Sequence, residues 1–388
     1  MKEKKLRMGV VGGGIGSFIG PIHRQAALLD NHIELVCGCF SSHPEVSRRS
    51  GAACGLPESR VYGTCQEMFE REMQLPADQR MEIVSIVTPN KYHIQPALMA
   101  LDCGMHVVLD KPLTLTLEEA RQLTRKVEET GLQMAVTYTY SAYPAVKEAR
   151  ERIARGELGT LRRLYVEYTQ GWLSQRIELQ GADNARWRTD PELGGTGGTI
   201  ADIGTHVLHL SEHITGQRVT ELCAEMNTLV PGRQAPDDGT AFLHFDGGMK
   251  GCLTATQIAI GDNNYIRIRV YGDKGGIDWC QPDPNKLILK GLGEQEQTIY
   301  IGSNTNLSEA AAWNTRTPGG HPEGYIEAFA NIYRNFALTV LALRRGDTPS
   351  PLMLDFPTVY DGLRGMQFIE TMEASSRNND TKWTKWIE

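Results

Sequence analysis

Short apolar runs alternate with helical segments along the first part of the chain, and this alternation constrains the fold more than any other feature of the sequence. Runs of strand length lie at Leu6–Val11, Glu34–Phe40, Ile83–Val87, His106–Leu109 and Met134–Thr139. Helical spacing of apolar residues separates them, most clearly at Thr116–Thr130, where charged residues fill the opposite face. Strands that alternate with helices predict an α/β fold with a doubly wound parallel sheet.

A glycine-rich loop, Gly12–Gly20, separates the first strand from a helical stretch at Pro21–Leu29. Glycine lets the backbone approach a ligand closely, and a helix N-terminus favours negative charge, so this arrangement can cradle a pyrophosphate. Such a loop can also be a plain tight turn, but its place at the start of the alternating pattern favours a dinucleotide cofactor. The candidate contacts in the loop are Gly12, Gly14, Ile15, Ser17, Phe18 and Ile19.

The end of the second strand bears on the choice between NAD and NADP. NAD-selective sites usually place an acid there to hold the ribose 2′-hydroxyl, but Phe40–His43 contains none, and the first carboxylate is Glu45. Ser41, Ser42 and Arg48 could bind a 2′-phosphate instead. Alternatively, the two serines only cap the helix that follows. The pattern leaves both cofactors open.

The strand at Val107–Leu109 ends in Asp110-Lys111-Pro112. Proline has no N–H to donate and stops the strand, and ligands of open parallel sheets bind beyond the carboxyl ends of the strands. Lys111 is therefore placed for chemistry. In isolation the tripeptide is better explained as a surface lysine before a turn, but the glycine loop and a later Asp–His pair favour a functional lysine.

From about Leu161 the pattern changes to consecutive strand-like runs with short turns, which predicts an α+β domain with a large, mostly antiparallel open sheet. The runs lie at Leu161–Thr169, Val219–Met226, Thr240–Phe245, Gly251–Ala259 and Ile266–Tyr271, with weaker candidates at Lys286–Leu289 and Gln297–Ile301. Helices near Ile200–Ile214, Glu323–Arg344 and Phe356–Ser376 can cover one face of this sheet. A second copy of the chain could cover the other, so we expect a homodimer or homotetramer formed through the sheet.

With 388 residues the chain is too long for one ordinary core, and we expect a dinucleotide-binding domain at 1–140 and a substrate-binding and oligomerisation domain at 141–388. The net charge is 40 − 47 = −7 and no basic tract can neutralise a run of phosphates, so nucleic acid is not an expected partner. Neither a signal peptide nor a membrane span is apparent. The eight cysteines are scattered without a C-x-x-C pair, which indicates reduced thiols in a cytoplasmic protein.

Asp202 and His206 are four residues apart, so on a helix they share a face and can touch. A carboxylate beside an imidazole raises its basicity and fixes its orientation, as a general base requires. An ordinary helix pair is the alternative, and for a random pair at this spacing it is the commoner one. His209 extends the same face, but the three residues match no known metal-ligand spacing, and we expect no metal. The long stretch Trp172–Gly198 is a candidate wall of the site.

Together these stretches resemble the glucose–fructose oxidoreductase / inositol dehydrogenase / MocA family (Gfo/Idh/MocA) over nearly the whole chain. The resemblance depends on the order and spacing of several motifs, none of which is specific alone. They are Gly12–His23, Thr88-Pro89-Asn90 with His93, Asp110-Lys111-Pro112, Trp187-Arg188, Asp202–His206 and Asp361-Gly362-Leu363-Arg364. The resemblance implies a Rossmann domain, a separate substrate domain, and a dehydrogenase of sugars or inositols that uses NAD or NADP.

The resemblance also implies roles for individual residues. His206 would be the base and Asp202 the accompanying acid, while Lys111, whose bond to Pro112 is often cis in relatives, would hold the reacting oxygen and the nicotinamide ribose. Outside the glycine loop, the cofactor would contact Ser41, Ser42, Thr88, Pro89, Asn90, His93, Asp110 and Lys111. The substrate would contact Lys111, Tyr138, Tyr140, Trp187, Arg188, Asp202, His206, His209 and His321. For Tyr138 and Trp187, a place in the core is an equal alternative.

The chain departs from the family pattern at three places. Asp110 replaces the usual glutamate, and His209 stands where relatives that act on inositol often have an aspartate. Gly12 and His23 are 23 − 12 = 11 residues apart where relatives commonly have eight, so the loop carries a three-residue insertion and Gly20 would take the last glycine position.

Two other functions occur among proteins with this resemblance. One is a hydrolase that cleaves glycosides with a tightly held NAD and no net redox change. The other is a non-catalytic sugar sensor. Sensors usually lack the lysine and the histidine, and the presence of Lys111 and His206 makes the sensor the less favoured alternative.

Overall fold

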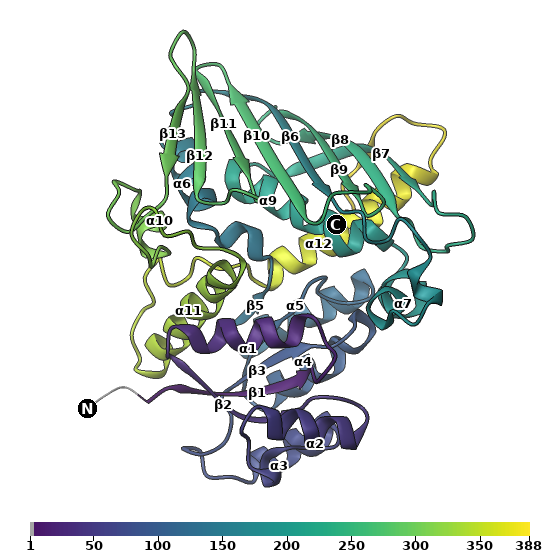
Figure 1. The fold of residues 1–388 in the computed structure, drawn as a ribbon, viewed down its shortest axis with the longest axis vertical. Coiled ribbons are helices and arrows are strands. Elements are labelled where there is room, and N and C mark those ends of the chain that lie inside the picture. Colours follow the sequence, from purple (N-terminus) through teal and green to yellow (C-terminus); the bar gives the residue numbers. More distant parts are fainter. Residues whose placement is uncertain (1–3) are drawn as a thin grey trace. The chain divides into compact units, whose positions relative to one another are not determined.

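The computed structural model describes residues 4–388, and the chain divides into two compact units (Figure 1). The first unit runs to Thr137 and also contains Phe329–Leu363, while the second comprises Tyr138–Ala328 and Arg364–Glu388. The division expected from the sequence, 1–140 and 141–388, differs because the chain returns to the first unit near its end. Side-chain burial explains the return: Phe336 and Tyr333 are fully buried there, and the Tyr333 hydroxyl lies 2.7 Å from Ser85 Oγ.

The first unit contains a five-stranded parallel sheet with the strand order β2-β1-β3-β4-β5. Its strands are β1 (Leu6–Gly12), β2 (Ile33–Cys39), β3 (Ile83–Val87), β4 (His106–Leu109) and β5 (Met134–Val136). Its helices are α1 (Ile19–Leu29), α2 (Pro44–Ala53), α3 (Cys65–Met73), α4 (Ile94–Asp102), α5 (Leu117–Thr130) and most of α11 (Tyr325–Arg344). The expected doubly wound parallel sheet is confirmed, and β3 is buried at every residue, as such a sheet requires.

The helix expected at Thr116–Thr130 shows how the local sequence sets its own ends. The Thr116 hydroxyl accepts the Glu119 N–H, and the Glu119 carboxylate accepts the Thr116 N–H in return. This capping box satisfies two amides that the helix itself leaves open. At the other end, Gly131 adopts a left-handed conformation with φ 66°, which a glycine reaches without strain.

The second unit contains a nine-stranded sheet with the order β13-β12-β11-β10-β6-β9-β8-β7-β14 (Figure 1). Its strands are β6 (Leu161–Thr169), β7 (Val219–Asn227), β8 (Asp238–Phe245), β9 (Lys250–Thr256), β10 (Tyr265–Gly272), β11 (Gly275–Cys280), β12 (Lys286–Gly291), β13 (Gln297–Tyr300) and β14 (Thr384–Lys385). The expected mostly antiparallel sheet is confirmed. The strands β11 and β14 were not predicted from the sequence, and neither was the parallel pairing of β6 with β9.

Helices cover one face of this sheet. The helices of the second unit are α6 (Pro144–Ala154), α7 (Asp183–Thr189), α8 (Pro191–Gly194), a π-helix (Ile200–Gly204), α9 (Thr205–Thr215), α10 (Glu309–Trp313) and most of α12 (Val359–Arg377). Short 3₁₀ turns lie at Glu58–Arg60 and Asn90–Tyr92 in the first unit and at Thr139–Ala142 and Ile177–Leu179 in the second. Both α6 and α9 pack on sheet strands, and two serines of α12 accept backbone N–H groups from β7.

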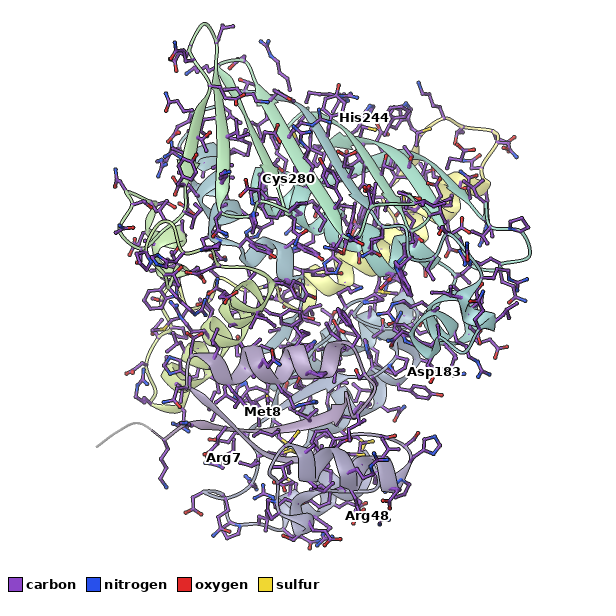
Figure 2. The ribbon with its side chains drawn as sticks, in the orientation of Figure 1. Arg7, Met8, Arg48, Asp183, His244 and Cys280 are labelled. Carbon is purple, nitrogen blue, oxygen red and sulfur yellow. The ribbon has the colours of Figure 1, made fainter. Side chains whose placement is uncertain are left out.

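The opposite face of the sheet is open to solvent. Pairing across β8, β9, β6, β10 and β11 places Phe242, His244, Tyr165 and Cys280 on this same face. Figure 2 labels His244 on β8 and Cys280 on β11. Phe242 is 49% exposed and Tyr165 is 38% exposed, which leaves aromatic surface uncovered. Among the described helices, none is both long and apolar enough to cross a membrane.

Candidate active site

The glycine loop of the first unit forms a tight backbone cradle at the start of α1. Gly12 and Gly13 have φ values of 83° and 67°, a conformation that other residues adopt only under strain. A Cβ atom on Gly20 would lie 2.2 Å from the Gly13 carbonyl oxygen, so α1 approaches the loop closer than any side chain allows. Two apolar side chains of the loop remain open to solvent, since Ile15 is 53% and Phe18 is 62% exposed. These features fit a pyrophosphate held against a helix N-terminus.

The segment after β2 carries the residues expected near the ribose. The Ser41 hydroxyl accepts the His43 N–H at 3.1 Å, and the helix cap itself is His43, which makes no side-chain capping bond. The alternative in which the serines merely cap α2 is therefore not supported. Arg48, labelled in Figure 2, is paired with Glu45 at 2.6 Å, so part of its charge is already compensated.

Two parallel strands end close together at His93. Its Nε2 lies 2.8 Å from the Thr88 carbonyl after β3, and its Nδ1 lies 3.0 Å from the Pro112 carbonyl after β4. Burial lowers the pKa of His93, while Asp110 and the carbonyl contacts act in the opposite direction. The ring therefore joins two of the segments that were expected from the sequence to contact the cofactor.

Asp110 connects the end of β4 with the end of β5. One of its carboxylate oxygens accepts both the Lys111 N–H and the Thr137 hydroxyl at 2.8 Å. The peptide bond between Lys111 and Pro112 is cis, as the family resemblance implied. The Asp110 carboxylate, which lies where β4 ends, thus holds the backbone N–H of Lys111.

In the second unit, Asp202 lies within the π-helix that precedes α9. π-helices are rare and are frequent at functional sites, whereas the sequence predicted one continuous α-helix here. Asp202 Oδ2 accepts the Gln257 side-chain N–H at 2.8 Å and lies 3.2 Å from Arg188 Nε. One hydrogen-bond donor and one ion pair therefore hold this carboxylate in place. The expected contact between Asp202 and His206 stays a prediction.

His206 is buried among aromatic rings. The centroid of its ring lies 4.9 Å from that of Tyr140 and 5.6 Å from that of Tyr138, both edge to face. Tyr138 stacks on His209 with centroids 4.6 Å apart. Tyr138 is 1% exposed and Tyr140 5% exposed, so the two tyrosines are core residues of the second unit that also line His206.

A hydrogen-bonded set of neutral side chains continues from these rings. The Tyr140 and Tyr168 hydroxyls lie 2.8 Å apart, and Tyr168 donates to Asn264 Oδ1 at 2.6 Å. Gln170 donates to the same oxygen at 2.8 Å and accepts from Gln257 at 3.1 Å. Burial raises the pKa of Tyr140 and of Tyr168, so both phenols keep their protons at neutral pH. We call Tyr140, Tyr168, Gln170, Gln257 and Asn264 the polar chain.

Four members of the polar chain, Tyr168, Gln170, Gln257 and Asn264, were not predicted from the sequence. Gln170 directly follows β6 and Gln257 directly follows β9, and these are the two strands that pair in parallel. Polar residues at the ends of two strands were a visible signal. This signal could be used only once the parallel pairing of β6 with β9 was known, because that pairing brings the carboxyl ends of the two strands to the same edge of the sheet.

Trp187 and Arg188 lie on α7, inside the stretch expected to form a wall of the site. The Arg188 guanidinium stacks over the Trp187 ring at 4.1 Å and lies 5.8 Å from the ring of Trp172. Because Arg188 also pairs with Asp202, this part of the expected substrate set is brought together. His321 lies instead in an exposed turn, where its backbone carbonyl accepts the Thr317 hydroxyl. The role of His321 in substrate binding stays a prediction.

Two family models match the chain along most of its length. One, described as an oxidoreductase family with an NAD-binding Rossmann fold, matches residues 6–138, and the other, the GFO/IDH/MocA C-terminal domain, matches residues 146–278. The chain belongs to the Gfo/Idh/MocA family. The fold of both units and the Rossmann assignment expected from the sequence are thereby confirmed.

Relatives of the chain within the Gfo/Idh/MocA family extend over its whole length. The uncharacterized oxidoreductase YfiI of Bacillus subtilis is 31% identical over 390 residues, covering 100% of this chain and 97% of that protein. The levoglucosan dehydrogenase of Pseudarthrobacter phenanthrenivorans is 26% identical over 331 residues, covering 77% and 81% respectively. The crystal structure of an inositol dehydrogenase homolog from Azotobacter vinelandii in complex with NAD⁺ superposes with a TM-score of 0.93 at 32% identity, covering 99% and 98%. This Gfo/Idh/MocA member is accordingly an NAD(P)-dependent oxidoreductase.

Proposed function

We propose that this Gfo/Idh/MocA enzyme oxidises a CH–OH group of a sugar, a sugar derivative or an inositol and transfers the hydride to NAD or NADP. The observation that carries the proposal is the polar chain beside Asp202 and His206. Its amides and phenols are neutral, and each can donate or accept a hydrogen bond. Such a surface matches a ligand with many hydroxyl groups, because every hydroxyl is also both donor and acceptor.

The charges in this part of the second unit support the same substrate class. Arg188 is the cation next to Asp202, and the two compensate each other. A strongly anionic substrate would need a surplus of positive charge, which this pair does not offer. A neutral polyol needs none.

The chemical roles follow from where each group is held. When bound, the nicotinamide cofactor accepts the hydride. His206 takes the proton from the reacting hydroxyl, and its buried, ring-lined position keeps water from that nitrogen. Lys111 stabilises the charge that develops on the reacting oxygen. Asp202, held by the Gln257 amide and paired with Arg188, orients the base and the substrate.

The decisive experiment is a turnover screen with purified protein, NAD or NADP, and panels of aldoses, inositols, glycosides and amino sugars. Formation of reduced nicotinamide with one panel is the expected result and identifies both cofactor and substrate class. Cleavage of glycosides without net reduction would instead establish the NAD-dependent hydrolase. Binding of a sugar with neither reaction would establish a sensor.

Two variants test the roles of the reacting groups. We expect Lys111→Ala and His206→Ala each to lower kcat by about 100-fold or more, the range that a general acid or base supplies, with melting temperature nearly unchanged. Lys286→Ala and His32→Ala are the matched controls, since they remove the same two side-chain types elsewhere. Turnover by His206→Ala close to that of His32→Ala would reject the base assignment.

We also propose that the enzyme is a cytoplasmic homodimer or homotetramer formed through the open face of the nine-stranded sheet. The exposed aromatic rings of Tyr165 and Phe242 support this, because extended apolar patches are costly to leave in water. All eight cysteines are free thiols, as a reducing compartment requires. Light scattering should show an oligomer that Phe242→Asp dissociates, and a monomeric wild-type protein would contradict the proposal.

A further inference from the structure

A buried hydrogen-bonded chain crosses the first unit between three elements that are distant in sequence. Ser85 on β3 lies 2.7 Å from the Tyr333 hydroxyl on α11, and that hydroxyl lies 2.8 Å from His23 Nδ1 on α1. Ser85 and Tyr333 are fully buried, and His23 is 1% exposed. The edge of the His23 ring also contacts Phe329 at 4.7 Å between centroids, which fixes the plane of the imidazole.

The far end of this chain points at Asp110. His23 Nε2 is buried, forms no hydrogen bond with residues 4–388, and lies 3.9 Å from Asp110 Oδ2. The other oxygen of the same carboxylate already accepts the Lys111 N–H and the Thr137 hydroxyl. Asp110 therefore receives donors on one oxygen and faces the imidazole with the other.

The environment decides which ring nitrogen carries the proton. Burial lowers the pKa of His23 to about 4, with a smaller opposing effect from Asp110, so the ring is neutral at physiological pH and has a single N–H. Burial also raises the pKa of Tyr333, which keeps its phenolic proton. If Tyr333 donated to Ser85 and accepted an N–H from His23 Nδ1, the Nε2 lone pair of His23 would face a carboxylate, which is repulsive. If Tyr333 donates to His23 Nδ1, the Nε2–H faces Asp110, which is attractive.

We propose that His23 is a positioning residue whose Nε2–H, oriented by Tyr333 and Ser85, holds the Asp110 carboxylate and through it the backbone of Lys111. The proposal depends on the proposed function only in assigning chemistry to Lys111. At 3.9 Å the contact between His23 and Asp110 is electrostatic, and it strengthens if the gap closes when ligands bind. The hydroxyl of Tyr333 thus acts on Lys111 from α11, more than 200 residues away along the chain.

The test separates orientation from packing. Tyr333→Phe keeps the ring and removes only the hydroxyl, and we expect kcat to fall about tenfold while the dissociation constant for the cofactor stays within twofold. His23→Leu should lower kcat by at least as much. His23→Gln, whose amide can present an N–H near the Nε2 position, should recover part of the loss.

Tyr62→Phe is the matched control. Tyr62 is also a buried tyrosine of the first unit, and its hydroxyl donates to Glu72 at 2.8 Å, so the same substitution removes an equivalent bond away from Asp110. We expect a similar loss of melting temperature in both variants but a fall in kcat only in Tyr333→Phe. Equal kcat values in the two variants would overturn the proposal.

A spectroscopic measurement, which does not depend on turnover, locates the proton on the His23 ring. Nitrogen-15 spectra of protein with labelled histidine rings should show His23 protonated at Nε2 in the wild type, and a tautomer mixture in Tyr333→Phe. A proton on Nδ1 in the wild type would overturn the proposal. Normal turnover by Lys111→Ala would contradict the proposed function itself. If Lys111→Ala is inactive but Tyr333→Phe turns over normally, only the positioning role of His23 and Tyr333 is rejected.

Discussion

Gln257 donates a hydrogen bond to Asp202 at 2.8 Å, although the two residues are 55 positions apart and come from a strand end and a π-helix. The same amide group donates to Gln170, and its oxygen accepts the Thr199 hydroxyl at 2.8 Å. Gln257 therefore holds the carboxylate of the proposed acid in one orientation and joins it to the polar chain.

Removing this amide should impair the reaction without affecting the cofactor. We expect Gln257→Leu to lower kcat/KM about 10- to 100-fold, because a hydrogen bond to a charged group contributes about 1.5–3 kcal/mol. Steady-state kinetics with the substrate found in the screen provide the measurement. Gln66→Leu is the control, since Gln66 also donates to a carboxylate, that of Glu70 at 2.8 Å, but on an exposed helix surface. A fall in kcat/KM of the same size in the control would contradict the assigned role.

The close contact between α1 and the glycine loop predicts the effect of one added methyl group. In Gly20→Ala the new Cβ would meet the Gly13 carbonyl at 2.2 Å, so the loop must move. We expect cofactor affinity, measured by calorimetry, to fall at least tenfold, in line with the 1–3 kcal/mol typical of overpacking. Gly63→Ala is the control, because its Cβ would have 3.6 Å to the nearest atom, and unchanged binding in Gly20→Ala would show that the cradle is not the cofactor site.

The absence of an acid directly after β2 predicts tolerance for a 2′-phosphate. We expect NADP to bind within about tenfold of NAD, and Ser42→Asp to weaken NADP selectively by charge repulsion over a few ångströms. Fluorescence titration with both cofactors provides the measurement. A wild-type enzyme that binds NADP far more weakly than NAD would show that Ser41 and Ser42 do not serve the phosphate.

A buried ion pair should dominate the stability of the second unit. Arg364 contacts both oxygens of Glu212 at 2.8 and 3.1 Å, and Glu212 also accepts the Val219 N–H at 2.8 Å. Glu212→Gln leaves the Arg364 charge without its partner, and we expect a loss of about 3 kcal/mol in the free energy of unfolding. Glu118→Gln, which breaks an exposed pair with Arg125, should cost far less stability than Glu212→Gln, and equal losses in urea denaturation would contradict the argument.

The buried His23 and the half-buried His106 should make the first unit sensitive to acid. Removal from water lowers the pKa of His23 and of His106 to about 4, against 6.5 for the free side chain. Between these values the unfolded chain binds protons that the folded chain does not. The contribution of these histidines to the free energy of unfolding is therefore fully present above about pH 6.5. It is lost as the pH is lowered toward 4, by up to about 3 kcal/mol for each residue.

His106→Gln isolates one of these two contributions. The amide oxygen of the new residue can still accept the Gln133 N–H that His106 Nδ1 accepts at 2.9 Å, but it does not titrate. Urea denaturation at pH 7.5 and pH 5 should show a smaller acid-induced loss in this variant than in the wild type. An identical loss would mean that His106 does not titrate as its burial implies.

The sequence determined the parts of this protein that local chemistry controls. Strand periodicity, glycine at the loop, and the Thr116–Glu119 capping box depend on neighbours in the chain, so both sheets and the doubly wound order were predictable. The family motifs also gave the position of Lys111 and the cis bond that follows it. The place of Gly20 as the last glycine of the loop stays a prediction, with which its close approach to Gly13 agrees.

Only the tertiary structure decided which distant residues act together. The parallel pairing of β6 with β9 brings Gln170 and Gln257 into contact, and no local preference encodes a pairing between strands 80 or more residues apart. In the same way, burial of α11 against the first unit places the Tyr333 hydroxyl on His23, 310 residues away along the chain. The sequence supplies such polar groups, but the packing of apolar surface decides which of them meet, because contact energies depend on the whole fold and not on local spacing.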